Sequence, residues 1–334
     1  MRVAILTANH IDKLRDVGDI HAHALHKHLT DSGHETDIIY LYSNLKSTNA
    51  VPIYKAIFKS YDFIYASSPK RLYAILCLFF SLVKFKNLNL SVFDSTLEPI
   101  TSSSTAKMIF KFLYKNSLIR FISASKYQQK YIKKSLGINT PILYPCLLTF
   151  GYNKRSKTST KTILFAGSTN NKKRGLDTIL KAVSILRKKY PHIKIRILNK
   201  FKSSERWAEI TPLLIRKYKL HNNVEQIGYV KHMANEYKKA SVYVLPFNTT
   251  KYIPPLPFTM LEAMSFSVPV ISSKIEAFRE ILPLENTIAP GDYKTLSTKI
   301  SFILSKNMSV SLPKQFFPKE TAKRFVELIG LKQK

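Results

Sequence analysis

The sequence holds 334 residues, more than one hydrophobic core usually serves, so two domains are the first expectation. Lysine and arginine number 53 against 21 aspartates and glutamates, which gives a formal net charge of +32. An excess of this size attracts phosphate, whether from a nucleic acid, an anionic membrane surface or a phosphorylated ligand. Two cysteines, Cys77 and Cys146, exclude a disulfide framework and fit a reducing compartment.

The first residues, MRVAILTA, enter a strand directly and lack a signal-peptide pattern, so we expect a cytoplasmic protein. The most apolar run, Leu72 to Val83, is too short for a bilayer, which needs about 20 apolar residues. A buried helix is the first interpretation of this run. The alternative is an interfacial helix on the inner membrane face, with flanking cations at Lys70, Arg71, Lys84 and Lys86.

Strands and helices alternate through the first half of the chain. Strands are predicted over Val3–Thr7, Thr36–Leu41, Tyr61–Ala66, Leu88–Phe93, Ile119–Ser123 and Pro141–Tyr144. Helices are predicted over Ile20–Ser32, Leu72–Val83, Ser104–Tyr114 and Gln128–Ser135. Alternation of this kind indicates crossover connections and a parallel sheet.

The same alternation restarts after a polar linker, residues 151–161, that lacks apolar periodicity. Strands are predicted over Thr162–Ala166, Ile193–Leu198, Val224–Gly228, Val242–Pro246 and Val268–Ile271, followed by a segment at Asn286–Ala289. Helices are predicted over Leu176–Tyr190, Trp207–Lys217, Met233–Ala240, Phe258–Phe266, Tyr293–Leu304 and Glu320–Ile329. The sequence therefore predicts two doubly wound α/β domains, residues 1–150 and 162–312, with a ligand cleft between the carboxyl ends of their sheets.

Glu262 is the first candidate site residue. It stands between Leu261 and Ala263 on a short apolar helix that follows a proline-stiffened loop. Because burying a carboxylate is costly without a hydrogen-bond donor, Glu262 either pairs locally or faces a cleft and accepts hydroxyl protons from a ligand.

The turn Gly167 to Gly175, GSTNNKKRG, joins a strand to a helix and is the second candidate. It matches neither a Rossmann fingerprint nor a Walker A loop. It does bring backbone N–H groups and a helix N-terminus together with Lys172, Lys173 and Arg174, an arrangement that suits a diphosphate. The alternative is a solvated basic turn.

Gly18 and Asp19 precede the first predicted helix and offer a second N-terminus that tolerates anions; the alternative is an ordinary N-cap at Asp19. The helix itself carries His21, His23, His26 and His28. These fall on different faces, without cysteine or carboxylate at ligand spacing, so we expect no metal and instead polar contacts from His21 or His23 in the cleft.

Asp94 ends a predicted buried strand, where catalytic or binding groups often stand in α/β sheets. The alternative is a turn residue, because Asp94-Ser95-Thr96 is favourable turn chemistry, and the same choice applies to Glu98. The sequence has no D-x-D pair to hold a nucleotide-bound metal and no G-x-S-x-G elbow.

The second half resembles the retaining glycosyltransferases of family 4, which have the GT-B fold. The segments that carry the resemblance are ILFAGS with KKRGLDTILKAVSILRKKYP, NNVEQIGYVKHMANEYKKASVYVLPF, LPFTMLEAMSFSVPVISS and APGDYKTL. The first half matches more loosely, and the tail, residues 313–334, resembles the helix that crosses back to the first domain in this fold.

The resemblance implies transfer of a sugar from a nucleotide-sugar with retention at the anomeric carbon, and no cofactor. Glu262 matches the second glutamate of an E-x7-E motif, which binds the ribose hydroxyls. Arg174 stands where a diphosphate-clamping lysine is usual. Gly18 matches a loop that lies near the phosphates in this family. Tyr229 and Val230 match the region that holds the base. Asp94 matches the region where many members have a catalytic histidine or aspartate.

Two positions depart from the family pattern. The first glutamate of E-x7-E falls at Pro254, so sugar recognition would pass to backbone groups around Pro254, Pro255 and Leu256. The arginine expected after Gly167 is Ser168, so the phosphate clamp would rest on Arg174 with Lys172 or Lys173.

The sequence thus predicts a glycosyltransferase that uses a nucleotide-sugar and a glycan or lipid-linked acceptor, with a basic surface suited to an anionic membrane. Two alternatives remain. A degenerate protein of the same fold would bind nucleotide or glycan without transfer, and a basic nucleic-acid-binding protein would explain the charge, although no known nucleic-acid motif supports it.

Overall fold

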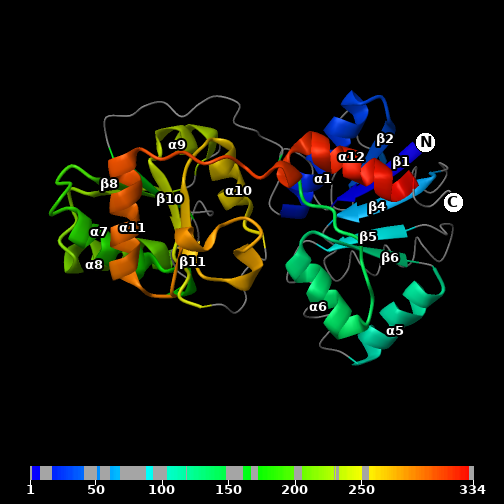
Figure 1. Ribbon diagram of the computed structural model, residues 1–334, viewed down its shortest axis with the longest axis horizontal. Coiled ribbons are helices and arrows are strands. Elements are labelled where there is room, and N and C mark those ends of the chain that lie inside the picture. Colours follow the sequence, from blue (N-terminus) through cyan, green and yellow to red (C-terminus); the bar gives the residue numbers. More distant parts are fainter. Residues whose placement is uncertain are drawn as a thin grey trace. The chain divides into compact units, whose positions relative to one another are not determined.

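The computed structural model describes residues 2–7, 17–40, 51–52, 61–67, 88–92, 104–117, 119–147, 161–166, 172–198, 205–228, 230, 233–249 and 256–330. The chain divides into two compact units. The first holds Met1–Leu148, Pro254–Leu256 and Pro313–Lys334, and the second holds Thr149–Ile253 and Pro257–Leu312. Figure 1 shows the first unit in blue, cyan and red and the second in green to orange. Leu72 to Val83 and the linker 151–160 lie outside the described residues.

The first unit is built on a parallel sheet of six strands in the order β3-β2-β1-β4-β5-β6. Its strands are β1 (Arg2–Thr7), β2 (Glu35–Tyr40), β3 (Val51–Pro52), β4 (Phe63–Ser67), β5 (Leu88–Val92) and β6 (Ile119–Ser123). Its helices are α1 (Val17–Asp31), α5 (Ser104–Lys115), α6 (Lys126–Leu136) and α12 (Pro318–Gly330), with η5 at Lys314–Phe316.

The C-terminal helix α12 packs in the first unit, although 181 residues, 137–317, separate it from α6. It contacts α1, and Phe325 of α12 meets Tyr65 of β4 edge to face with ring centroids 5.1 Å apart. Just before α12, Phe316 makes a similar contact with Tyr144. The apolar side Ala322, Phe325 and Ile329 is buried, so hydrophobic burial holds the tail against this unit.

The second unit repeats the topology with the order β12-β11-β10-β7-β8-β9, all parallel. Its strands are β7 (Thr162–Ala166), β8 (Lys194–Leu198), β9 (Val224–Gly228), β10 (Val242–Leu245), β11 (Val270–Ser273) and β12 (Thr287–Ile288). Its helices are α7 (Leu176–Leu186), α8 (Glu205–Lys217), α9 (Met233–Lys239), α10 (Phe258–Ser265) and α11 (Tyr293–Lys306), with short turns η2 (Lys172–Arg174), η3 (Glu276–Phe278) and η4 (Leu284–Asn286).

The main core of the second unit lies between one face of this sheet and helices α7, α8 and α11. Alternate strand residues supply it, such as Ile163 and Phe165 of β7 and Val242 and Val244 of β10. Figure 1 shows α9 and α10 on the other side of these strands. The intervening residues of β7 and β10 therefore face α9 and α10.

Two sequence predictions are wrong in detail. Gly18 was expected in a loop before the first helix, but α1 begins at Val17, so Gly18 lies in its first turn. Pro141 to Tyr144 forms no strand: Ile142 makes a single bridge to Ser123. Two prolines, Pro141 and Pro145, remove backbone donors from this segment, and a ladder cannot propagate through them.

The turn that enters α7 is pressed against the end of β10. Gly175 is the N-cap of α7 with a φ of 76°, in the left-handed region. A Cβ placed there would stand 1.7 Å from the carbonyl oxygen of Pro246. Only glycine satisfies both the backbone conformation and the close approach, so this residue fixes Lys173 and Arg174 beside β10.

We expect Gly175→Ala to lower the free energy of unfolding by at least about 2 kcal/mol, because a backbone clash adds to the left-handed strain. Gly291→Ala is the matched control, since Gly291 has a φ of 79° and open space around its Cβ position. It should cost only about 1 kcal/mol. Urea unfolding of the full chain measures both, and equal losses would contradict the close approach.

Candidate active site

Tyr243 stands at the centre of a polar cluster on the α9 and α10 side of the second sheet. Its neighbours Val242 and Val244 point into the main core, so strand alternation turns Tyr243 the other way. Its ring meets that of Tyr237, on α9, edge to face with centroids 6.0 Å apart. Its hydroxyl lies 3.4 Å from the carbonyl oxygen of Ala166, the last residue of β7.

Glu262 of α10 joins this cluster through a hydrogen bond. The hydroxyl of the buried Tyr237 donates to its Oε2 at 2.8 Å. Burial raises the pKa of Glu262 to about 7, against the lowering effect of the Tyr237 hydrogen bond. The side chain stays partly exposed between the buried Leu261 and Ala263. Near neutral pH, Glu262 can therefore be a hydrogen-bond donor or a carboxylate.

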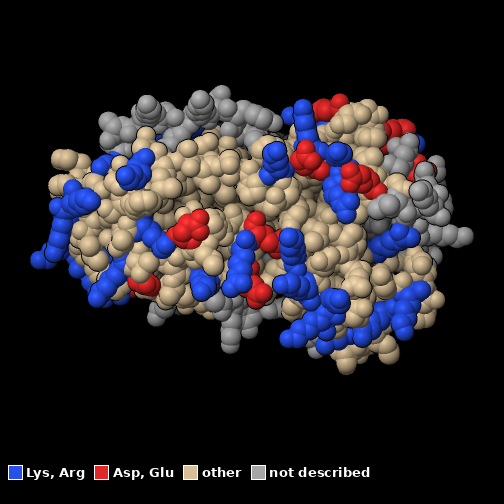
Figure 2. Space-filling view, in the orientation of Figure 1, with Lys and Arg blue, Asp and Glu red and all other residues tan. Residues whose placement is uncertain are grey.

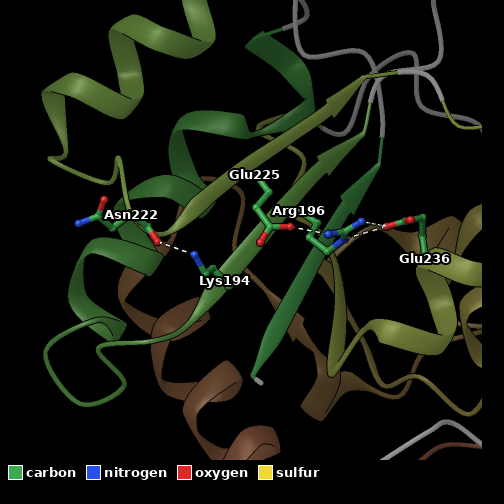
Figure 3. A network of polar contacts seen from close by, with 5 residues as sticks. All are labelled: Lys194, Arg196, Asn222, Glu225 and Glu236. Carbon is green, nitrogen blue, oxygen red and sulfur yellow. Dashed lines mark hydrogen bonds and ion pairs between the residues drawn. The ribbon is translucent and has the colours of Figure 1, made fainter. Parts of the chain in front are cut away.

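An ion pair anchors the helix that carries Tyr237. The neighbouring residue, Glu236, is buried and accepts from the guanidinium of Arg196 on β8 at 2.8 Å. Figure 3 shows Arg196 between Glu236 and Glu225 of β9, with a separate bond from Lys194 to the carbonyl of Asn222. Because a buried carboxylate needs its partner, this pairing fixes α9 against the sheet. It thereby fixes the direction of the Tyr237 hydroxyl.

Arg174 belongs to the short turn η2, between β7 and α7. Its guanidinium stands over the ring of Phe247, with Cζ 5.2 Å from the ring centroid. The turn is tied to the residues after β10, because the N–H of Asn248 donates to the carbonyl of Lys173 at 2.9 Å. The hydroxyl of Thr178 adds a bond to the Asn248 side chain at 2.8 Å.

Glu262 and Arg174 act on the same hydroxyl. Burial is the main cause that raises the pKa of Tyr243, and a hydrogen bond with the Thr259 side chain opposes it. The Glu262 carboxylate raises this pKa further and the Arg174 guanidinium lowers it. Burial also lowers the pKa of Arg174 itself. A cation and an acid thus flank Tyr243 beside the carboxyl ends of β7 and β10. The strand order reverses between these two strands, which is where open α/β sheets bind ligands.

For the other predicted site residues, the structure gives only the exposure of the side chain, or the residue lies outside the described part of the chain. Lys173 has an exposed side chain, Val230 is half-buried and Leu256 is buried. The backbone of Lys172 belongs to η2, but its side chain lies outside the description. Six further predicted site residues lie wholly outside the described residues: Asp94, Gly167, Ser168, Tyr229, Pro254 and Pro255.

The histidines of α1 contribute to the interior of the first unit. The N–H of Cys146 donates to His21 Nδ1 at 3.1 Å, so His21 carries its proton on Nε2, which lies 3.0 Å from the hydroxyl of Tyr65. Burial lowers the pKa of His21 to about 3 and keeps the ring neutral. His23 is buried and stacks on Tyr40. The polar contacts of His21 or His23 in a cleft stay a prediction; within the first unit both side chains are buried.

Asp19 is not an N-cap. It lies inside the first turn of α1, where its carboxylate accepts from the Thr7 hydroxyl at 2.7 Å. Within the described part of the chain, no three His, Cys, Asp or Glu side chains are grouped closely enough to hold a metal ion. None of the helices described there has the length and apolar character needed to cross a bilayer.

Sequence reasoning missed Tyr237, Tyr243, Arg196 and Glu236. Their roles depend on which strand face and which helix meet, and local spacing does not give that. One signal was present: a glutamate among apolar residues requires a donor, and a tyrosine in the preceding helix could supply it.

A known protein family matches most of the second unit. Residues 160–306 match the family model for glycosyl transferases group 1. An uncharacterised glycosyltransferase of Haemophilus influenzae is 30% identical over 120 residues, a stretch that covers 36% of this chain and 31% of that protein. The chain thus matches about a third of the length of this curated relative.

Solved structures match nearly the whole chain. HepE of Anabaena, in complex with UDP-glucose, has a TM-score of 0.75 at 12% identity, covering 99% of this chain and 100% of that one. A glycosyltransferase of Rickettsia africae has a TM-score of 0.76 at 12% identity, covering 100% and 98%. The predicted GT-B fold, with two Rossmann-like parallel sheets, is confirmed.

Proposed function

We propose that this chain is a glycosyltransferase that moves a hexose from a nucleotide-sugar to a glycan or lipid-linked acceptor, with retention of anomeric configuration. The observation that carries the proposal is that Glu262, bonded to Tyr237, and Arg174, over the ring of Phe247, both act electrostatically on Tyr243, a residue of β10 at the reversal point of the second sheet. The group 1 domain supports the same assignment. The resemblance to family 4 supports retention.

Each charged group has a role toward the donor. The ionised carboxylate of Glu262 accepts hydrogen bonds from the ribose hydroxyls, which fixes the nucleoside. Arg174 lies within reach of the diphosphate, together with the basic residues of its turn. As the glycosidic bond to the diphosphate breaks, negative charge grows on the leaving oxygen, and a fixed guanidinium stabilises that charge. We propose no metal for this step, and Asp94 remains the predicted catalytic group of the first domain.

The donor base is proposed by analogy. HepE binds UDP-glucose, so uridine is the first base to test, although its identity with this chain is only 12%. A panel of UDP-, GDP- and ADP-sugars covers the alternatives.

We expect one donor class to raise the melting temperature of the protein by a few degrees when present well above its Kd. Arg174→Ala should abolish most of this shift, since the diphosphate loses its half-buried cation. Arg279→Ala, an exposed arginine of the same unit, is the control and should keep the shift. No shift with any nucleotide-sugar would refute the donor site. A shift without release or transfer of sugar would leave a nucleotide-binding protein and refute the transferase.

The affinity for the donor should depend on pH, because only ionised Glu262 accepts from both ribose hydroxyls. A carboxyl group with a pKa of about 7 is roughly one-tenth ionised one pH unit below its pKa and roughly nine-tenths ionised one pH unit above it. The Kd of the nucleotide-sugar should therefore fall about tenfold from one unit below neutrality to one unit above.

Calorimetric titration across this range checks that expectation. Glu262→Gln should give weak binding with a flat pH profile, while the exposed Glu285→Gln should keep the wild-type profile. An unchanged slope in Glu262→Gln would show that another group causes the pH dependence.

Tyr237→Phe tests the hydrogen bond to Glu262. The bond lowers the pKa of Glu262, so its loss should raise the midpoint of the pH profile. The expected rise is about one pH unit, because one such hydrogen bond contributes about 1 kcal/mol and one pKa unit corresponds to about 1.4 kcal/mol. Phe266→Leu is the control, because Phe266 stacks on the Tyr237 ring without touching the hydrogen bond. If both variants only weaken binding without moving the midpoint, Tyr237 has a packing role alone.

A further inference from the structure

Helix α5 of the first unit shows two apolar sides. Phe110 and Leu113 are buried in the core of that unit. On the outer side, Met108 is 66% exposed, Phe112 61% and Ile109 44%. Met108 and Phe112 are one turn apart and therefore lie side by side on the surface. Single exposed hydrophobic side chains are common on protein surfaces. Three of them within two turns of one helix form an apolar patch, which indicates a surface that binds a protein or a membrane.

Lysines surround this apolar stripe. Lys111 and Lys115 are exposed and lie on the same outer side of α5 as Met108 and Phe112. Helix α6 adds four exposed lysines, Lys126, Lys130, Lys133 and Lys134. Figure 2 shows the cations over α5 and α6 as a blue field at lower right, without an acidic side chain among them.

The absence of acids continues along the sequence. No aspartate or glutamate occurs between Glu98 and Asp177, so the whole α5–β6–α6 region carries positive charge alone. A surface of one charge sign is complementary to a partner of the opposite sign, so the partner of this face is anionic. A surface of one sign with an apolar centre suits a partner that is anionic at every point and apolar beneath, which describes an anionic bilayer.

We propose that the outer side of α5, with the lysines of α6, docks on an anionic lipid bilayer. Met108, Ile109 and Phe112 enter the boundary between headgroups and acyl chains, and the lysines contact lipid phosphates. Nucleic acid fits less well, because Met108 and Ile109 have no ring to stack on bases. This docking surface lies in the first unit and does not depend on the proposed donor site.

Co-sedimentation of the full-length protein with vesicles tests the proposal. Phosphatidylcholine vesicles with and without phosphatidylglycerol are compared. The protein should sediment with the anionic vesicles, and Phe112→Ser should weaken that binding about tenfold, the loss expected for one inserted aromatic side chain. Lys111→Glu with Lys115→Glu should weaken it at least tenfold, since each lysine near an anionic surface contributes about 1 kcal/mol.

Matched controls come from α11 of the second unit. Phe302 is 55% exposed and Lys306 is exposed one turn later. Phe302→Ser and Lys306→Glu should leave vesicle binding unchanged, and unchanged melting temperatures verify that all variants fold. Equal binding to neutral vesicles, no binding to anionic ones, or equal losses in the α11 variants would overturn the proposal. Tight RNA binding that is lost in Lys111→Glu with Lys115→Glu, without vesicle binding, would overturn it in favour of nucleic acid.

Discussion

The hydrogen bond from Tyr237 to Glu262 is the interaction on which the candidate site depends. This bond stabilises the ionised form of the Glu262 carboxylate, whereas burial of the side chain disfavours that form. The folded pKa of Glu262 lies above its unfolded value, so the folded state holds the proton more tightly. Ionisation of Glu262 therefore lowers stability as pH rises from about 4.5 to about 7. The ionised form that the proposed ribose contact requires is thus the form that lowers stability, a cost that is common at functional sites.

Strand β10 joins the stability of the second unit to its chemistry. One side of the strand fills the core through Val242 and Val244, and the other presents Tyr243 to the site. Beyond its end, the hydroxyls of Ser272 and Ser273 hold the carbonyls of Leu245 and Phe247. The turn that carries Arg174 then closes on Pro246 through Gly175. Arg174 is thus placed by backbone packing, and its long side chain needs little ordering on binding.

Most strands and helices could be predicted from the sequence because each shows its own periodicity. β6, β7 and β9 have the predicted bounds, and the other described strands differ by one or two residues, apart from the two-residue β3, which was not predicted. The errors have local causes. Glycine at position 18 suggested a loop, but helix geometry tolerates it in a first turn, and the prolines around Ile142 stop a ladder that its neighbours would allow. The partners of Glu262 could not be predicted, because they come from another helix and depend on how the sheet packs.

The α5–β6–α6 region has a further property that follows from its composition. Between Glu98 and Asp177 the chain has neither carboxylates nor histidines, and its one cysteine, Cys146, is buried. This region therefore lacks the side-chain types that ordinarily titrate near neutrality, whereas the pKa of Glu262 in the proposed donor site is raised to about 7. Under the two proposals, acidification would weaken donor binding through Glu262, while the membrane-docking surface has no such group.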